Sequence, residues 1–128
     1  MDSTKEKQAW REVKYSRKFF NAFRGVYVFI KTTKNSHLAI YAISSAVVVF
    51  LGCYFNISNI EWSALVFAIG LVIISEVFNT AIEIDMDLTS PEYHPHARDT
   101  KDVAAGAVLL ASFCATVVGL IIFLPKIL

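Results

Sequence analysis

Three long apolar stretches constrain the fold of this chain more than any other feature. They cover residues 38–55, 60–84 and 103–124 of a chain in which 55% of the 128 residues are hydrophobic. A helix of roughly 20 apolar residues crosses the hydrocarbon core of a bilayer, so the second and third stretches are long enough and the first is adequate. A soluble domain of this size could not bury so much apolar side chain. We therefore predict an all-α, polytopic membrane protein with three transmembrane helices.

Basic residues set the expected orientation of these helices. Nine of the twelve Lys and Arg residues lie within residues 1–34, and Arg98 and Lys101 lie between the second and third spans. Cytoplasmic loops are enriched in Lys and Arg. We therefore expect the N-terminus and the loop of residues 85–102 on the cytoplasmic side of the cell inner membrane.

A further helix is expected ahead of the first span, over residues 7–34. Apolar residues recur there at helical spacing, and basic residues occupy much of the remaining surface; the apolar residues are Trp10, Val13, Phe20, Phe23, Tyr27 and Ile30. This pattern is typical of an amphipathic helix that lies on the inner leaflet with its cations toward phosphate headgroups. With the three spans it would complete a single membrane domain over residues 1–128.

The third span carries small residues at four-residue spacing, namely Ala107, Ala111, Ala115 and Gly119. Such a ridge lets another helix approach closely. The partner helix could belong to the same chain or to another subunit, and the spacing fits both.

A polar stripe near the end of the second span is the main candidate for function. Asn79, Glu83 and Asp87 all lie within about 60° of Glu76 around a helix that turns about 100° per residue. An ionised carboxylate costs at least about 2.5 to 3.5 kcal/mol at the centre of a bilayer. Two such groups can divide the work, because one can hold a divalent cation while another, buried, accepts a proton. The alternative is that they are interfacial carboxylates that reach water.

The polar loop after this span ends in Lys101 and Asp102, at the start of the third apolar helix. A helix N-terminus favours an anion such as phosphate, and lysine is a mobile cation suited to a polyphosphate. His94 and His96 could bind a metal, but two nitrogens without a third ligand favour contact with solvent or nucleotide instead. The sequence has no Walker A loop and no Rossmann fingerprint, so helix faces and termini would have to hold a nucleotide.

Three blocks of this sequence closely resemble the small prokaryotic integral-membrane diacylglycerol kinase and undecaprenol kinase family. They read EVFNTAIE over residues 76–83, SPEYH over residues 90–94 and KDVAAGAV over residues 101–108. The resemblance extends from about residue 17 to the C-terminus, and the first block with its downstream Lys-Asp pair is highly specific. It implies a homotrimer of three-helix subunits with active sites shared between neighbours.

The resemblance also implies roles for individual residues. Glu76 would be the general base that deprotonates the lipid hydroxyl, and Asn79 would contact the transferring γ-phosphate of ATP. Glu83 would bind Mg²⁺, and Lys101 would neutralise the phosphates with support from Asp102. The nucleotide would be bordered by further residues, namely Gly25, Asp87, Tyr93 and His94. These roles suit phosphoryl transfer, which needs mainly alignment, metal and positive charge.

Thr33 is the one marked departure from the family pattern. The family normally places a second metal-binding glutamate there, within a T-E-x-N pattern, whereas residues 31–35 of this chain read KTTKN. A neutral hydroxyl cannot replace an anionic ligand of a hard cation. Binding of Mg²⁺ should therefore weaken unless water, Asp87 or another carboxylate compensates.

The favoured function is an ATP-dependent lipid kinase that phosphorylates diacylglycerol or undecaprenol at the inner leaflet. We expect ATP, a membrane lipid alcohol and the bilayer as partners, and no nucleic acid. One alternative is a non-catalytic homologue that binds lipid or nucleotide, which the residue at position 33 keeps open. Another is a proton- or cation-conducting protein, but its acidic stripe would stop halfway through the membrane.

Overall fold

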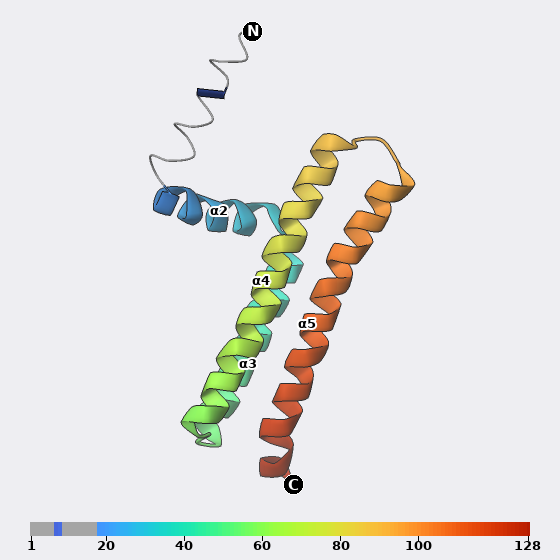
Figure 1. Cartoon of the computed structure of the whole chain (residues 1–128). Helices are drawn as coiled ribbons and strands as arrows, with labels where there is room; N and C mark the ends of the chain where they lie inside the picture. Colours follow the sequence, from blue (N-terminus) through green and yellow to red (C-terminus); the bar gives the residue numbers. More distant parts are fainter. Residues whose placement is uncertain (1–6, 9–17) are drawn as a thin grey trace. The chain divides into compact units, whose positions relative to one another are not determined.

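The computed structural model describes residues 7–8 and 18–128, and the described part contains four named helices and no strand (Figure 1). They are α2 (Lys18–Thr32), α3 (Asn35–Tyr54), α4 (Asn59–Thr89) and α5 (Pro95–Ile127). Three of them, α3, α4 and α5, are long and apolar enough to cross a membrane. The predicted all-α fold with three transmembrane helices is therefore confirmed. The chain divides into two compact units, residues 1–32 and residues 33–128.

The first unit contains α2, which falls within the surface helix expected over residues 7–34. The apolar side chains of Phe23, Tyr27 and Ile30 are exposed along it. An exposed apolar stripe of this kind suits the interface between lipid and water. The expected stripe begins at Trp10, and residues 9–17 lie outside the described part of the chain.

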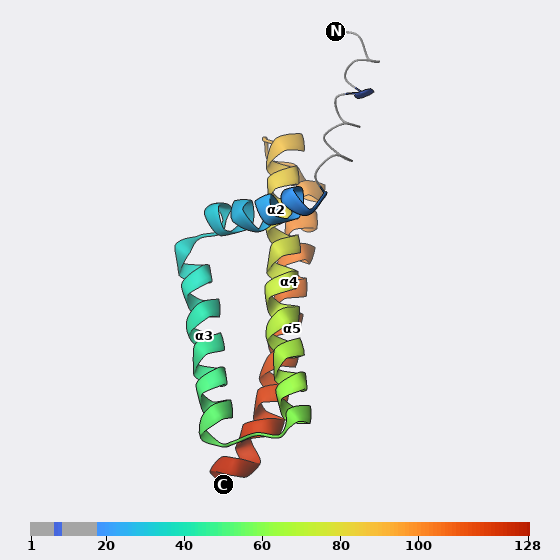
Figure 2. The ribbon, with the colours of Figure 1, turned by 90° about the vertical axis from the view of Figure 1, so that its left-hand side faces the viewer.

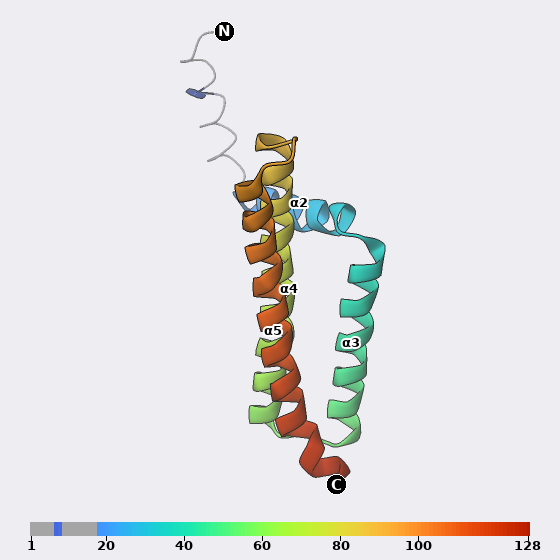
Figure 3. The same ribbon diagram turned by 90° about the vertical axis from the view of Figure 1, so that its right-hand side faces the viewer.

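In the second unit, α3 and α4 form a hairpin whose tight link is visible in Figures 2 and 3. Asn56 takes a left-handed conformation, with φ of 51°, which asparagine tolerates better than most residues. Ser58 then caps α4: its hydroxyl accepts from the Glu61 amide, and the Glu61 carboxylate accepts from the Ser58 amide. This reciprocal pair satisfies two amides that the first turn of a helix leaves unpaired.

The apolar core of the second unit lies at the end where α3 and α4 are joined. Ile57, Leu65, Ile122 and Phe123 are buried together there. The α4 and α5 helices run side by side, as Figure 1 shows. Lys126 near the end of α5 pairs with Glu61 at the start of α4, at 2.9 Å. Packing and an ion pair thus hold these two ends together.

The helices are longer than the apolar stretches that predicted them. Only residues 90–94 between α4 and α5 are non-helical, whereas residues 85–102 were expected to form the loop. Hydropathy marks the part of a helix that suits lipid, and polar turns can extend the same helix into water. The start of α5 follows ordinary capping rules, since the His94 side chain caps it and Pro95 stands in the first turn.

The three long helices alternate in direction, and this determines where the polar residues meet. The start of α3, the last turns of α4 and the start of α5 all lie at the end of the unit opposite the apolar core, as Figure 2 shows. The residues singled out by the sequence between positions 76 and 102 therefore share one end of the bundle.

Candidate functional site

The centre of the candidate site is a set of buried polar side chains on α4. Glu76, Asn79 and Thr80 are 4%, 8% and 5% exposed, within a helix that otherwise presents mainly apolar side chains to the bilayer. Glu83 and Asp87, one and two turns further on, are exposed. The predicted stripe thus runs from a buried carboxylate to carboxylates at the polar end of the helix.

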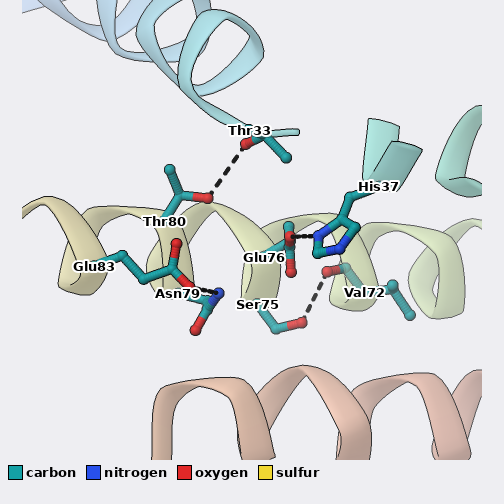
Figure 4. A network of polar contacts seen from close by, with 8 residues as sticks. All are labelled: Thr33, His37, Val72, Ser75, Glu76, Asn79, Thr80 and Glu83. Carbon is teal, nitrogen blue, oxygen red and sulfur yellow. Dashed lines mark hydrogen bonds and ion pairs between the residues drawn. The ribbon is translucent and has the colours of Figure 1, made fainter. Parts of the chain in front are cut away.

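Glu76 faces α3. Its Oε1 atom lies 3.4 Å from Nδ1 of His37 (Figure 4), and the Tyr41 hydroxyl faces the same carboxylate. His37 and Tyr41 are four residues apart, so they share one face of α3. Neither residue was predicted to belong to the site, although their four-residue spacing is visible in the sequence. The contact between His37 and Glu76 joins positions 39 residues apart and cannot be read from a single sequence.

Asn79 and Glu83 form a second contact on α4. The Asn79 Nδ2 atom donates to the Glu83 carboxylate at 3.3 Å (Figure 4). Asn79 Oδ1 is buried and has no hydrogen-bond partner among the described residues. A buried acceptor without a partner is costly, and such atoms in native proteins commonly mark a place where water, an ion or a ligand binds.

Thr33, at the position of the expected family glutamate, is buried and lies close to α4. Its hydroxyl oxygen is 3.3 Å from that of Thr80 (Figure 4). This neutral contact joins the residues just ahead of α3 to the helix that carries Glu76 and Glu83. An acidic side chain at position 33 would therefore lie beside the α4 stripe.

A second group of charges lies where α4 ends and α5 begins. Lys101 Nζ pairs with the Asp87 carboxylate at 2.5 Å, and Arg98 pairs with Asp102 at 3.5 Å. In this structure the carboxylate partner of Lys101 is Asp87, and the expected support of Lys101 by Asp102 stays a prediction. Adjacent residues on a helix point about 100° apart, whereas residues four apart share a face. Arg98 is a cation of this group that the sequence analysis did not assign to the site.

These charges border a cavity of about 270 Å³. Its lining includes all the loop-side residues predicted to border a nucleotide or its phosphates, namely Asp87, Tyr93, His94, Lys101 and Asp102. The ring of His94 caps α5, since its Nδ1 accepts from the His96 amide at 3.2 Å. Within the described residues, no group of three or more His, Cys, Asp or Glu side chains is placed to hold a metal.

A larger cavity, of about 350 Å³, lies between α3, α4 and α5. Its lining is mainly apolar, and the small residues Ala115 and Gly119 of the α5 ridge contribute to it. Several hydroxyl groups also line it, those of Tyr41, Ser44, Ser45, Ser112 and Thr116. Because Tyr41 also faces Glu76, it connects this apolar cavity with the buried carboxylate.

The predicted site residues thus form two groups. Glu76 is surrounded by residues of α3, whereas Lys101 and Asp87 lie around the second cavity. Eleven residues of α4 separate Glu76 from Asp87, about 16 Å along the axis at about 1.5 Å per residue. Asn79 and Glu83 lie between them. Gly25 belongs to α2 in the first unit, and a Cβ at that position would meet nothing within 4 Å.

Comparison with known proteins gives consistent matches. The family model described as prokaryotic diacylglycerol kinase matches residues 20–123. An undecaprenol kinase of Bacillus subtilis is 35% identical over 114 residues, which cover 89% of this chain and 91% of that protein. A diacylglycerol kinase of Synechocystis is 36% identical over 111 residues, covering 86% of this chain and 62% of that protein. No solved structure matches this chain.

Proposed function

The chain belongs to the prokaryotic diacylglycerol kinase family, and from this premise we propose that it transfers the γ-phosphate of ATP to undecaprenol at the inner leaflet. It is a multi-pass membrane protein and a lipid kinase, that is, a phosphotransferase with an alcohol acceptor. The undecaprenol kinase that it resembles matches it over nearly the full length of both chains. Diacylglycerol is the second candidate acceptor, since a diacylglycerol kinase is equally similar over most of this chain.

The observation that carries the proposal is the cavity bordered by Lys101, Arg98 and His94 at the start of α5. The lining holds the two cations together with the carboxylates of Asp87, Glu92 and Asp102, so a polyphosphate would bind here by replacing carboxylates as the partners of the cations. The N-terminus of α5 favours the same anion, and Tyr93 offers an aromatic face to the adenine ring. We expect ATP to bind here with its phosphates directed toward Asn79 and Glu83. Lys101 would exchange Asp87 for the phosphates, because both are anionic partners of the same ammonium group.

Glu76 is the proposed general base. It is buried, adjoins the apolar cavity through Tyr41, and could accept a proton from a hydroxyl presented from the bilayer. We propose that this cavity receives part of the lipid chain next to the reacting hydroxyl. A carboxylate shielded from water and next to an apolar cavity suits a lipid alcohol better than a soluble one.

The donor set fits Mg²⁺ held jointly with ATP. Glu83 offers a carboxylate, and Asn79 offers a buried oxygen that has no partner within the described part of the chain. Protein sites for Mg²⁺ that also bind phosphates commonly supply only one or two carboxylates. We expect Glu83 to hold the metal and Asn79 to contact the γ-phosphate or a water on the metal. When bound, Mg²⁺ would offset the negative charge of the phosphates.

We further propose that the protein works as a homotrimer in the inner membrane, with its N-terminus in the cytoplasm. The basic residues ahead of α3 and around the start of α5 support this orientation. It would place the nucleotide cavity on the side where ATP is available.

The test is a substrate panel with purified protein in detergent or vesicles. Lipid-dependent formation of ADP from Mg-ATP is measured with undecaprenol, diacylglycerol and a soluble alcohol as acceptors. We expect the highest kcat/KM with undecaprenol, a loss of at least about 100-fold in Glu76→Gln, and no turnover with the soluble alcohol. A higher kcat/KM with diacylglycerol would show that diacylglycerol, and not undecaprenol, is the preferred acceptor. Nucleotide binding without turnover of any lipid would instead support a non-catalytic homologue.

A further inference from the structure

Glu76 lies in a position that creates a problem for a general base. Its side chain is only 5% exposed, so a proton taken from a substrate has no direct route to water. A base must lose that proton before the next turnover. Some neighbouring group has to accept it.

Two polar side chains of α3 face this carboxylate. His37 lies 3.4 Å from Oε1 through its Nδ1 atom, and Tyr41 faces the carboxylate with its hydroxyl. A phenol is a poor proton acceptor, whereas neutral imidazole accepts a proton readily near neutral pH. Of the two, only His37 can take the proton and give it up again.

His37 also has the exposure that a relay needs. Its side chain is 51% exposed, ten times the exposed fraction of the Glu76 side chain with which it pairs. Nδ1 faces the buried carboxylate, which leaves Nε2 on the opposite edge of the ring for water. The pair therefore joins a buried atom to solvent through one side chain (Figure 4).

We infer that His37 is a positioning residue for Glu76 that orients its carboxylate and carries the substrate proton from it to water. The inference rests on the proposed function. In the reaction, the lipid O–H bond breaks, an O–P bond forms to the γ-phosphorus, and the bond from that phosphorus to the oxygen of ADP breaks. Glu76 takes the proton and passes it to Nδ1 of neutral His37. Nε2 then releases its proton to water, which leaves a neutral ring with its hydrogen on Nδ1, and exchange with water restores the starting tautomer with its hydrogen on Nε2.

The test compares the wild type with His37→Ala, His37→Gln and the matched control Ser36→Ala, which alters an exposed neighbour. The kcat and the KM values for Mg-ATP and for lipid alcohol are measured with and without added imidazole. We expect His37→Ala to lower kcat at least about 10-fold with KM values within about two-fold, and imidazole to restore much of the loss. His37→Gln keeps a polar group beside Glu76 but cannot relay a proton, so it should stay slow and unrescued. Ser36→Ala and the wild type should not respond to imidazole.

Two results would overturn the relay in an active wild-type enzyme. One is a kcat of both His37 variants within about two-fold of the wild type. The other is a loss that imidazole does not reverse although His37→Ala melts at the wild-type temperature, because a purely structural role gives that pattern. If His37→Ala does not fold, full activity in His37→Gln overturns the relay and a slow, folded His37→Gln supports it. A wild type that turns over no lipid alcohol defeats the proposed function itself, and the relay falls with it.

Discussion

Lys101 shows how one side chain can serve as both a structural partner and a binding group. It pairs with Asp87 across the end of the bundle, and both side chains are partly exposed. Exposed ion pairs contribute only about 0 to 1 kcal/mol to stability. The pair is therefore easy to open when a more highly charged anion arrives, and this suits a phosphate-binding lysine better than a fixed structural bridge would.

Replacing Lys101 should therefore separate function from folding. We expect Lys101→Ala to lower kcat/KM for Mg-ATP about 100-fold or more, since it removes the charge nearest the phosphates, while the melting temperature changes little. The measurement is steady-state kinetics together with thermal unfolding in the same detergent. Arg98→Ala serves as a graded comparison and should show a smaller loss. Full activity in Lys101→Ala would show that this lysine does not contribute to nucleotide binding.

Position 33 allows the proposed Mg²⁺ site to be tested by adding a carboxylate. Thr33 lies 3.3 Å from the Thr80 hydroxyl, so Thr33→Glu would introduce a carboxylate beside the α4 stripe. We expect this change to lower the Mg²⁺ concentration that gives half-maximal activity, because carboxylates are preferred ligands of Mg²⁺. Thr33→Gln controls for size without charge and should not do so. If activity and Mg²⁺ dependence are the same in Thr33→Glu and the wild type, another group already fills that role.

Individual residues of the site were predictable to different degrees. Glu76, Asn79, Glu83 and Asp87 could be placed on one stripe because their spacing alone fixes their angles around a helix. The partners of these residues could not be placed in the same way. The contacts of Glu76 with His37 and of Lys101 with Asp87 depend on how separate helices pack, and helical periodicity contains no information about that.

At the scale of the helices, hydropathy identified the three spans but not where each helix ends. The signals for the ends were nevertheless local. Ser58 and Glu61 have the spacing of a capping box, and Pro95 stands where a first helical turn accepts proline. Prediction of the boundaries therefore needed capping chemistry, which acts through single side chains and is not visible in an average over an apolar window.

The hairpin between α3 and α4 depends on a close approach at Gly52. A Cβ at this position would lie 2.7 Å from Cη2 of Trp62, whereas one at Gly70 would meet nothing within 4 Å. We expect Gly52→Ala to destabilise the protein by about 1 to 3 kcal/mol through overpacking. The measurement is reversible unfolding in mixed micelles. Gly70→Ala is the matched control and should be at least as stable as the wild type, since alanine favours a helix; equal stability of the two variants would mean that Trp62 moves aside freely.

At the scale of the whole molecule, the distribution of the site raises the question of how many chains complete it. Glu76 and Lys101 belong to groups about 16 Å apart along α4, at about 1.5 Å per residue. A triphosphate bound between them could close that distance within one chain. The family resemblance instead implies that neighbouring subunits of a trimer share each active site. In the first arrangement Glu76 and Lys101 of one site belong to the same chain, and in the second they belong to different chains.

Mixing two inactive variants distinguishes these arrangements. Glu76→Gln and Lys101→Ala are each expected to be inactive or slow alone, and they are combined at equal amounts under conditions that allow subunits to exchange. If each site takes Glu76 from one subunit and Lys101 from its neighbour, about a quarter of the sites in randomly mixed trimers are intact, because a cyclic trimer has three equivalent interfaces. We therefore expect about a quarter of wild-type activity to return. If both groups act within one chain, every chain in the mixture lacks one of them and the activity stays at the level of the separate variants. In the same exchange between the double variant Glu76→Gln/Lys101→Ala and the wild type at equal amounts, about a quarter of the sites stay intact if each site needs two chains, and about half stay intact if each site needs one.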